Sequence, residues 1–185
     1  MALVIAHRTA AALAPENSLQ GIEQAASCHA NWVEMDVRLS RDGELVLMHD
    51  ESLERTSSGS GPVGERSLEE LKGLRLRNRD GSLDQSSTVP TLKEAITLAR
   101  ELGLGLVVEM KEEGLEGLLA ESTCREDCIV TSFYHASLCE LSEISSLKTG
   151  IIISALPINP VRLALEAGAS AIFPRRVNAR LFKEA

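Results

Sequence analysis

Short apolar runs alternate along the chain with stretches in which apolar residues recur at helical spacing. The first run, residues 3–6, ends at His7-Arg8, and Ser18 then caps a helix that begins near Leu19. By the same reasoning, further strands are predicted at residues 33–39, 44–48, 105–110, 128–133, 149–154 and 170–174. Further helices are predicted from Thr91 to Gly103 and at residues 115–122, 137–146 and 160–166. This order favours an α/β fold, with parallel strands covered by helices in a (β/α) barrel.

Residues 51–90 interrupt the alternation with two polar, turn-rich passages on either side of a short helix. Ser67 and Glu70 fit a capping box, in which hydroxyl and carboxylate satisfy each other's backbone amides, so a helix should begin there. The same pairing recurs at Thr91 and Glu94. We therefore expect a small insertion, at about 51–90, that extends from the barrel as a lid or excursion.

The composition excludes several classes of function. With 185 residues, 44% of them apolar, the chain is expected to form one domain, residues 1–185, around a hydrophobic core. A net charge of −8 disfavours nucleic acid as a partner, because phosphate backbones need clustered lysine and arginine. No apolar run reaches membrane-spanning length, so we expect a cytoplasmic protein without stable membrane insertion. The cysteines lack paired spacing and are expected to be reduced core thiols: Cys28, Cys124, Cys128 and Cys139.

Glu34 and Asp36 are candidate metal ligands. They lie two residues apart on a predicted strand, so they point to the same face, where like charges repel each other unless a cation lies between them. Glu109, at the end of a later strand, offers a third carboxylate, and a set of oxygen ligands favours Mg²⁺ or Ca²⁺. The alternative is a solvated or salt-bridged acidic pair that binds no metal.

Two histidines and two basic residues accompany these carboxylates. His7 and His49 each follow a predicted strand, and neighbouring parallel strands end at the same edge of a barrel, so we expect them to meet in one pocket. There they could act as base and acid in sequence, with Asp50 orienting a ring, although a single histidine at a strand end is more often structural. Arg8 and Lys111 indicate an anionic substrate, unless they only neutralise the acidic residues.

Taken together, these motifs resemble the glycerophosphodiester phosphodiesterase family in order and approximate spacing, over nearly the whole chain. The motifs that carry the resemblance are His7-Arg8, Pro15-Glu16-Asn17-Ser18, Glu34-Met35-Asp36-Val37, Asp42-Gly43, His49-Asp50, Arg55-Thr56, Glu109-Met110-Lys111 and Ser132-Phe133. The resemblance implies a TIM (β/α)8-type barrel that hydrolyses glycerophosphodiesters, which are small molecules, to sn-glycerol 3-phosphate and an alcohol.

The resemblance also implies a role for each candidate residue. By role, these are the metal ligands Glu34, Asp36 and Glu109, the acid–base pair His7 and His49, the phosphate-binding residues Arg8 and Lys111, and the pocket residues Glu16 and Asn17. No serine, cysteine or aspartate is placed as an obvious covalent nucleophile. We therefore hypothesise that the glycerol 2-hydroxyl attacks first and forms a cyclic phosphate, which water then opens.

Two departures from the family pattern leave alternatives open. Thr9 stands where relatives usually have glycine, so the loop next to the phosphate is expected to differ. Relatives continue into an eighth strand and a final helix, whereas this sequence stops at Ala185 within an expected seventh helix. A shortened barrel exposes strand edges and predicts self-association, unless the chain is a fragment or a partner chain fills the gap. A truncated, catalytically silent barrel used for binding or assembly is one alternative function, and a phospholipase or sphingomyelinase D type barrel is another.

Overall fold

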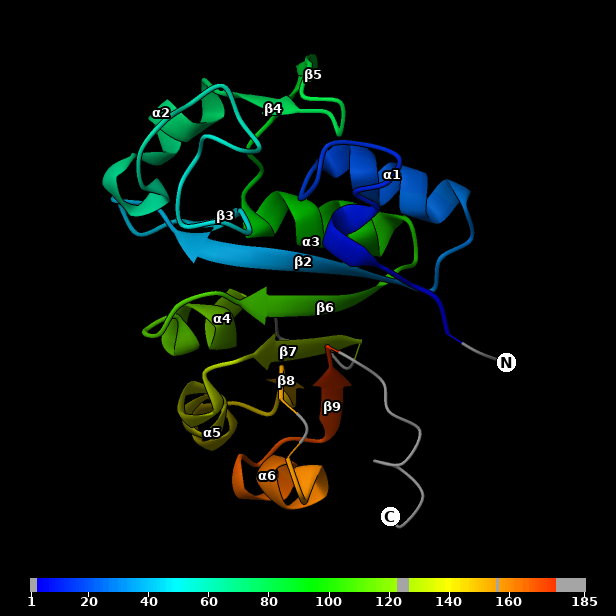
Figure 1. The fold of residues 1–185 in the computed structure, drawn as a ribbon, viewed down its shortest axis with the longest axis vertical. Coiled ribbons are helices and arrows are strands. Elements are labelled where there is room, and N and C mark those ends of the chain that lie inside the picture. Colours follow the sequence, from blue (N-terminus) through cyan, green and yellow to red (C-terminus); the bar gives the residue numbers. More distant parts are fainter. Residues whose placement is uncertain (1–2, 123–126, 156, 176–185) are drawn as a thin grey trace. The chain divides into compact units, whose positions relative to one another are not determined.

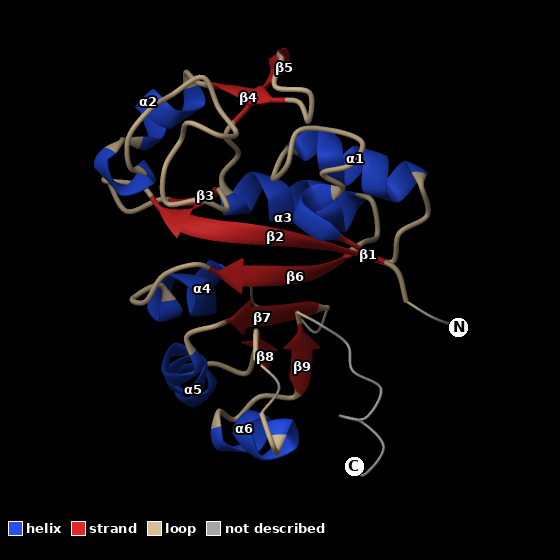
Figure 2. Cartoon of the chain, viewed as in Figure 1, coloured by secondary structure: helices blue, strands red, loops and turns tan. Residues whose placement is uncertain are grey.

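The computed structural model describes residues 3–122, 127–155 and 157–175, in two compact units, Met1–Glu109 and Met110–Ala185 (Figure 1). Both units alternate strands and helices, as the sequence predicts (Figure 2). Cys124 and the expected seventh helix at the end of the chain lie outside the described residues. Within the described ranges, no helix combines the length and the apolar character needed to cross a membrane.

Neighbouring strands form the centre of the first unit, in the order β1 (Ile5–Ala6), β2 (Trp32–Leu39) and β6 (Gly105–Met110). β1 and β2 pair in parallel, with Ile5 opposite Trp32, and the arrows of β2 and β6 point the same way in Figure 1. The middle of β2, Val33 to Val37, is buried throughout, as in a strand that is covered on both faces. Both long strands were predicted from the sequence with nearly these bounds.

Two capped helices accompany these strands and contact each other, α1 (Leu19–Ser27) and α3 (Leu92–Glu101). The Ser18 hydroxyl accepts a hydrogen bond from the Gly21 backbone N–H at 3.0 Å, which satisfies one of the free amides at the start of α1. α3 begins with the predicted capping box between Thr91 and Glu94. The start of each helix was therefore predicted from its local sequence.

Strand β3 (Leu45–Leu47) contradicts one prediction, because it runs antiparallel to β2. Leu47 lies opposite Val37 and Leu45 opposite Leu39. The connection between the two strands is a tight turn, which is far too short for the crossover that parallel strands require. The chain therefore folds back along β2, and the Met48 backbone N–H donates to the Asp36 carbonyl oxygen at 3.0 Å. His49 thus comes back toward the acidic residues of β2 instead of following the end of a parallel strand.

Residues 51–90 contain more secondary structure than the sequence pattern predicted: η2 (Val63–Glu65), α2 (Leu68–Lys72), β4 (Arg75–Arg77) and β5 (Leu83–Thr88). The short helix α2 begins with the predicted capping box, in which the Glu70 carboxylate accepts from the Ser67 N–H at 2.8 Å. β4 and β5 pair as an antiparallel hairpin that was not predicted.

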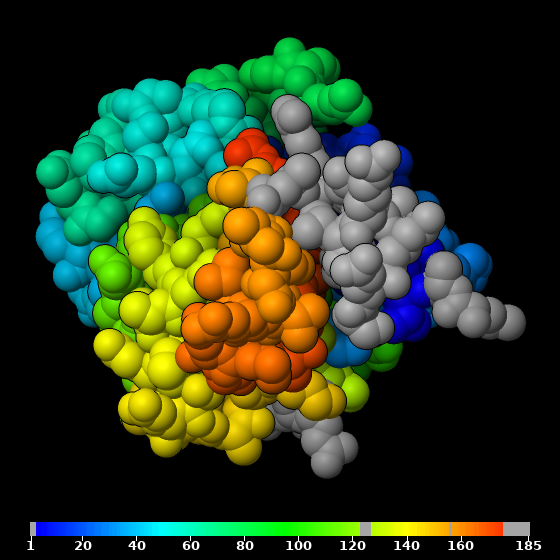
Figure 3. Space-filling model, turned by 60° about the horizontal axis from the view of Figure 1, so that its bottom comes forward, coloured from blue at the N-terminus to red at the C-terminus, as the bar shows by residue number. Residues whose placement is uncertain are grey.

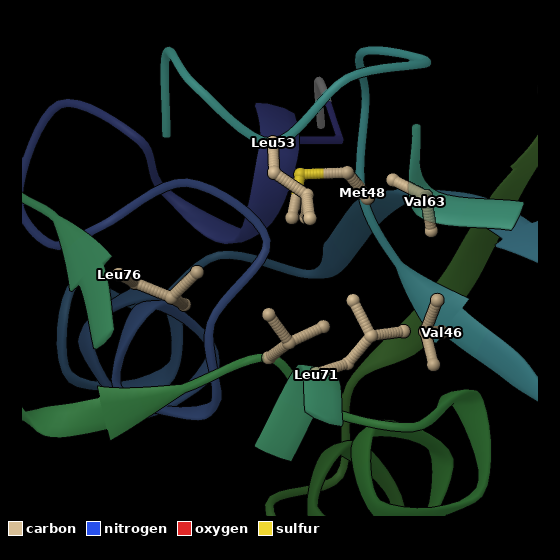
Figure 4. Packing of buried hydrophobic residues seen from close by; sticks show 7 residues of the cluster. Val46, Met48, Leu53, Val63, Leu71 and Leu76 are labelled. Carbon is tan, nitrogen blue, oxygen red and sulfur yellow. The ribbon is translucent and has the colours of Figure 1, made fainter. Parts of the chain in front are cut away.

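An apolar cluster joins this segment to β3 (Figure 4). Its members are at most 2% exposed: Val46, Met48, Leu53, Val63, Leu71, Leu76 and Val89. Val46 lies in β3 and Met48 just after it, whereas the others come from residues 51–90. Burial of side chains of this size stabilises a fold by about 1.5–3 kcal/mol each, so the chain that follows His49 is held in a packed arrangement.

The second unit repeats the strand–helix order: α4 (Glu116–Ser122), β7 (Cys128–Ser132), α5 (His135–Ile144), β8 (Lys148–Ile153), α6 (Pro160–Glu166) and β9 (Ala171–Pro174). β7, β8 and β9 are consecutive and parallel, with Ser132 opposite Ile151 and Ile153 opposite Pro174. Asn159 caps α6 as predicted, by accepting from the Arg162 N–H at 2.9 Å. Helices α5 and α6 contribute the yellow and orange surface in Figure 3.

The cysteines only partly match the prediction of core thiols. Cys28, Cys128 and Cys139 are free, in agreement with a reduced state. Cys128 is buried, Cys139 is partly buried and Cys28 is exposed. Cys28 directly follows the last residue of α1 and is exposed to solvent, so the prediction that it lies in the core was wrong.

Candidate active site

Three carboxylates converge on the first unit's central strands. Glu34 and Asp36 lie on β2, and Glu109 lies near the end of β6. One carboxylate oxygen from each residue lies within 4.8 Å of the other two. Asp36 is 1% exposed and Glu34 9% exposed, so the cluster is largely withdrawn from water. The pairing of Glu34 with Asp36 on one face follows from their spacing, whereas the approach of Glu109 depends on β6 lying next to β2.

The environment of Glu34 suits a hard cation. Burial raises the pKa of the Glu34 carboxyl to about 8, and the negative charges of Asp36 and Glu109 act in the same direction. The Arg8 backbone N–H donates to Glu34 Oε2 at 2.7 Å and opposes this increase in part. Glu34 Oε1 is buried and has no hydrogen-bond partner among the described residues. The side chains therefore fit a divalent cation with oxygen ligands, such as Mg²⁺ or Ca²⁺.

His7 and Arg8 lie in η1 (His7–Thr9), a short 3-10 turn in the loop after β1 that includes an unusual backbone conformation from Arg8 onward. Arg8, Thr9 and Ala10 have φ angles of 49°, 55° and 68°, in the left-handed region that non-glycine residues rarely adopt. The Asn17 backbone N–H donates to the Arg8 carbonyl oxygen at 3.0 Å, and the Ser18 N–H donates to Thr9 Oγ1 at 2.9 Å. Thr9 therefore keeps the conformation that glycine favours, and its buried hydroxyl contributes a bond that glycine cannot make.

His7 projects from this loop next to the acidic cluster. Its Nε2 lies 3.9 Å from Glu34 Oε2, and 71% of its side chain is exposed, so a solvent-borne ligand can reach the imidazole. Desolvation by the surrounding protein and the Arg8 charge lower the pKa of His7, against the opposing effect of nearby carboxylates. The neutral imidazole, which can accept a proton, is therefore the favoured form near neutral pH.

Arg8 and Asn17 contact Asp36, and Glu16 contacts Arg8. Arg8 Nη1 donates to both Glu16 carboxylate oxygens at 3.3 Å, and Arg8 Nε lies 3.7 Å from Asp36 Oδ2. The Asn17 side chain is buried and bonds twice to Asp36: its Nδ2 donates to Asp36 Oδ2 at 2.8 Å, and its Oδ1 accepts from the Asp36 N–H at 3.0 Å. Asn17 thus orients a carboxylate of the cluster, a contact that its predicted role as a pocket residue did not include.

His49 is oriented from its own side of the site. Its Nδ1 lies 2.6 Å from Asp50 Oδ1, and its carbonyl oxygen accepts from Arg38 Nε at 3.2 Å. The hydrogen bond from Arg55 holds the pKa of the Asp50 carboxyl well below its usual range, so Asp50 is ionised and accepts. His49 Nδ1 must then donate, which leaves Nε2 to exchange a proton with a ligand.

Arg55 belongs to this network, although the sequence assigned it no role. Arg55 donates to Asp50 and to Glu16, which are far apart in the sequence. Its place in the Arg55-Thr56 motif was the only signal, and that motif does not say which groups the side chain contacts. Of the nine predicted site residues, eight lie in the first unit. Lys111 lies in the second unit, so its predicted contact with phosphate stays a prediction.

Comparison with known proteins gives this arrangement a family. Residues 7–175 match the glycerophosphoryl diester phosphodiesterase family. A relative from Caldanaerobacter subterraneus subsp. tengcongensis, named glycerophosphodiester phosphodiesterase, is 32% identical over 182 residues, which cover 93% of this chain and 75% of the relative. A Bacillus subtilis relative is 34% identical over 158 residues, which cover 80% of this chain and 65% of the relative. The chain thus spans between about two thirds and three quarters of the length of these relatives.

Solved structures agree with this assignment. An Oleispira antarctica phosphodiesterase in complex with its product sn-glycerol-3-phosphate is 31% identical, with a TM-score of 0.83 over 94% of this chain and 75% of that one. A glycerophosphodiester phosphodiesterase from Agrobacterium tumefaciens is 28% identical, with a TM-score of 0.80 over 96% of this chain and 80% of that one. The predicted α/β TIM-barrel class is confirmed. The chain therefore belongs to the glycerophosphoryl diester phosphodiesterase family, a family of enzymes, as its motifs predicted.

Proposed function

We propose that this chain hydrolyses glycerophosphodiesters to sn-glycerol 3-phosphate and an alcohol, with a divalent cation and two histidines. The observation that carries the proposal is the cluster of three carboxylate oxygens within 4.8 Å of one another, with His7 3.9 Å from one of its members. Membership of the family supports it, as does the product bound to the Oleispira antarctica relative.

Glu34, Asp36 and Glu109 would hold Mg²⁺ or Ca²⁺ through their carboxylate oxygens. When bound, such a cation offsets the negative charge that grows on the phosphoryl oxygens during displacement. Asn17 keeps Asp36 in place through two hydrogen bonds, and the Arg8 backbone N–H holds Glu34 through one. The Arg8 guanidinium, beside the carboxylates, would contact the phosphate together with Lys111, and Glu16 would hold Arg8 in position.

The two imidazoles would exchange protons with the substrate in two steps. In the first step, one imidazole takes the proton of the glycerol 2-hydroxyl as its oxygen bonds to phosphorus, and the other gives a proton to the departing alcohol oxygen. In the second step, water attacks the cyclic phosphate and the roles reverse. The glycerol 2-hydroxyl then regains its proton, and both imidazoles return to their starting forms. Detection of a phosphorylated protein during turnover would contradict this scheme.

A matched series of histidine variants tests the proposal. The variants His7→Asn and His49→Asn, assayed with glycerophosphocholine and Mg²⁺ or Ca²⁺, should lose at least about 100-fold in kcat. The control is His29→Asn, because His29 is exposed and its φ of 57° suits asparagine. Equal turnover in all three variants would exclude the acid–base role.

The same assay separates the alternative functions. A folded wild-type chain that binds the cation but turns over no glycerophosphodiester would support the catalytically silent barrel. Hydrolysis of lysophosphatidylcholine without hydrolysis of glycerophosphocholine would support a lipid-directed phosphodiesterase. The cytoplasmic location and the self-association expected from the sequence remain predictions, and sedimentation of the purified chain as a single monomeric species would contradict self-association.

A further inference from the structure

Arg55 lies in the loop after β3 and uses three of its N–H groups on two carboxylates. Its Nε donates to Asp50 Oδ2 at 2.5 Å. Its Nη1 and Nη2 donate to Glu16 Oε2 at 2.9 Å and to Glu16 Oε1 at 2.7 Å, in a two-point contact. This planar, forked geometry is specific to a guanidinium, because the lysine ammonium is a single point charge that cannot bridge both groups in this way.

Each of these carboxylates also holds a group that the proposed reaction needs. Asp50 accepts from His49 through its other oxygen, Oδ1, at 2.6 Å. Glu16 accepts from Arg8 Nη1 with both oxygens at 3.3 Å. Arg55 therefore lies at the centre of a continuous chain of contacts that runs from His49 to Arg8. These contacts join the loop after β3 to the loop after β1, and Glu16 and Arg55 are 39 residues apart in the sequence.

We propose that Arg55 is a positioning residue: it fixes Asp50 so that His49 keeps its proton on Nδ1 and presents Nε2 to the substrate, and it fixes Glu16 so that Arg8 stays beside the phosphate. This inference rests on the proposed function, because it assigns Arg55 to the acid–base and phosphate-binding groups. Arg55 is not a member of the carboxylate cluster that would hold the cation.

Burial and charge support a role beyond surface stabilisation. The Glu16 side chain is 14% exposed and the Asp50 side chain 29%, whereas Arg55 is 47% exposed. A half-exposed arginine gives little to the stability of the fold, since exposed ion pairs contribute only modestly. Without Arg55, Glu16 loses its two shorter hydrogen bonds and keeps the longer ones from Arg8, and Asp50 loses the hydrogen bond to its Oδ2. The structure thus predicts a large effect on His49 orientation and a small effect on folding.

The test compares Arg55→Met and Arg55→Lys with Arg66→Met as the matched control. Arg66 lies in the same segment, its side chain is 42% exposed, and it pairs with a carboxylate, Glu70 at 3.6 Å. For each variant, kcat and KM for glycerophosphocholine are measured with Ca²⁺ or Mg²⁺. In the cation-free protein at pH 8.5, the ¹⁵N chemical shifts of the imidazoles report which nitrogen of His49 carries the proton.

In the wild-type protein and in Arg66→Met, His49 should carry its proton on Nδ1. In Arg55→Met, both nitrogens should share it, and kcat should fall on the order of 10- to 100-fold with little change in the midpoint of unfolding. Arg55→Lys should lie between the two, because it restores one contact. The wild-type tautomer of His49 in Arg55→Met would overturn the proposal. A rise in KM at unchanged kcat in this variant would also overturn it, since Arg55 would then contact the substrate directly. If the wild-type chain proves inactive, the proposed function fails, and the tautomer comparison still decides the role of Arg55.

Discussion

Replacement of Glu34 by glutamine tests the electrostatics of the carboxylate cluster directly. The amide has nearly the same shape as the carboxyl group, and its oxygen can still accept the Arg8 N–H that now donates at 2.7 Å. What the change removes is an ionisable group whose pKa burial raises to about 8, with Asp36 and Glu109 adding to the effect. Glu34→Gln should therefore alter how the stability of the cation-free protein depends on pH.

The sign follows from proton binding. In the unfolded chain the Glu34 carboxyl loses its proton near its ordinary pKa of 4.5, whereas in the folded protein it keeps the proton up to about pH 8. Between these values the folded state binds more protons than the unfolded state, so the free energy of unfolding falls as the pH rises. Each pH unit is worth about 1.4 kcal/mol, which makes the full effect on the order of 3–5 kcal/mol. A loss of that size is a large part of the usual stability of a domain.

Urea unfolding at pH values from 5 to 9, in the presence of EDTA, measures this effect. Trp32 on β2 is the single tryptophan of the chain and reports on the unit that contains Glu34. The wild-type free energy of unfolding should decline from pH 5 to about pH 8 and then level off, whereas the curve of Glu34→Gln should be flatter and should lie above it at pH 9. The exposed residue Glu23 on α1 supplies the control, since Glu23→Gln should follow the wild-type curve.

A cation should reverse the difference between the two proteins. At pH 8, saturating Ca²⁺ or Mg²⁺ binds only the folded state and should stabilise the wild-type protein by more than it stabilises Glu34→Gln. Parallel pH curves for the two proteins in EDTA would show that Glu34 is ionised at an ordinary pKa. Equal stabilisation by the cation would place its binding site elsewhere. Either result would refute the reasoning about this cluster.

Two other predictions concern the residues that hold the site together. Thr9→Val keeps the branched side-chain shape but leaves the buried Ser18 N–H without its acceptor, so it should lower the free energy of unfolding by about 1–3 kcal/mol. Thr9→Ser keeps the hydroxyl and should not lower it. Equal effects of the two variants would exclude this role of the hydroxyl. In Asn17→Gly, glycine suits the φ of 56° at this position, but both side-chain hydrogen bonds to Asp36 are lost. Calorimetric titration should therefore show about 10- to 100-fold weaker cation binding. Unchanged affinity would argue against the orienting role of Asn17.

Local sequence signals predicted the elements that depend on local chemistry. The capping boxes at Ser67 and Thr91 fixed the starts of α2 and α3, because a hydroxyl and a carboxylate three residues apart act within one turn. β6 was predicted with the bounds that the structure shows, because its apolar run ends at a polar residue and follows a helix stop. The hairpin of β4 and β5 was missed, since Leu83–Thr88 is mostly polar and is held by pairing with β4 rather than by a buried face.

The direction of β3 illustrates a different limit. Its apolar run, Leu45–Leu47, suits a strand of either direction, and only the short preceding turn indicates a hairpin. The expectation that His49 meets His7 at a shared edge therefore rested on the wrong direction for β3, and their meeting in one pocket stays a prediction. The contacts of Arg55 could not be predicted at all, because they depend on how the loop after His49 packs onto β3 rather than on any local pattern.

The pKa values of three carboxyl groups at the site, Glu16, Asp50 and Glu34, shift in different directions, and the arginine side chains account for the difference. Arg55 and Arg8 donate to Glu16 and, against the opposing effect of burial, lower the pKa of its carboxyl, and Arg55 does the same for Asp50. These carboxylates stay ionised and keep their partners in place. Glu34 accepts a hydrogen bond from the Arg8 backbone N–H, but burial raises the pKa of its carboxyl, so near neutral pH it holds a proton that a bound cation must displace. The surroundings therefore give these carboxyl groups different pKa values, as is common in sites where some carboxylates support the structure and others bind a ligand.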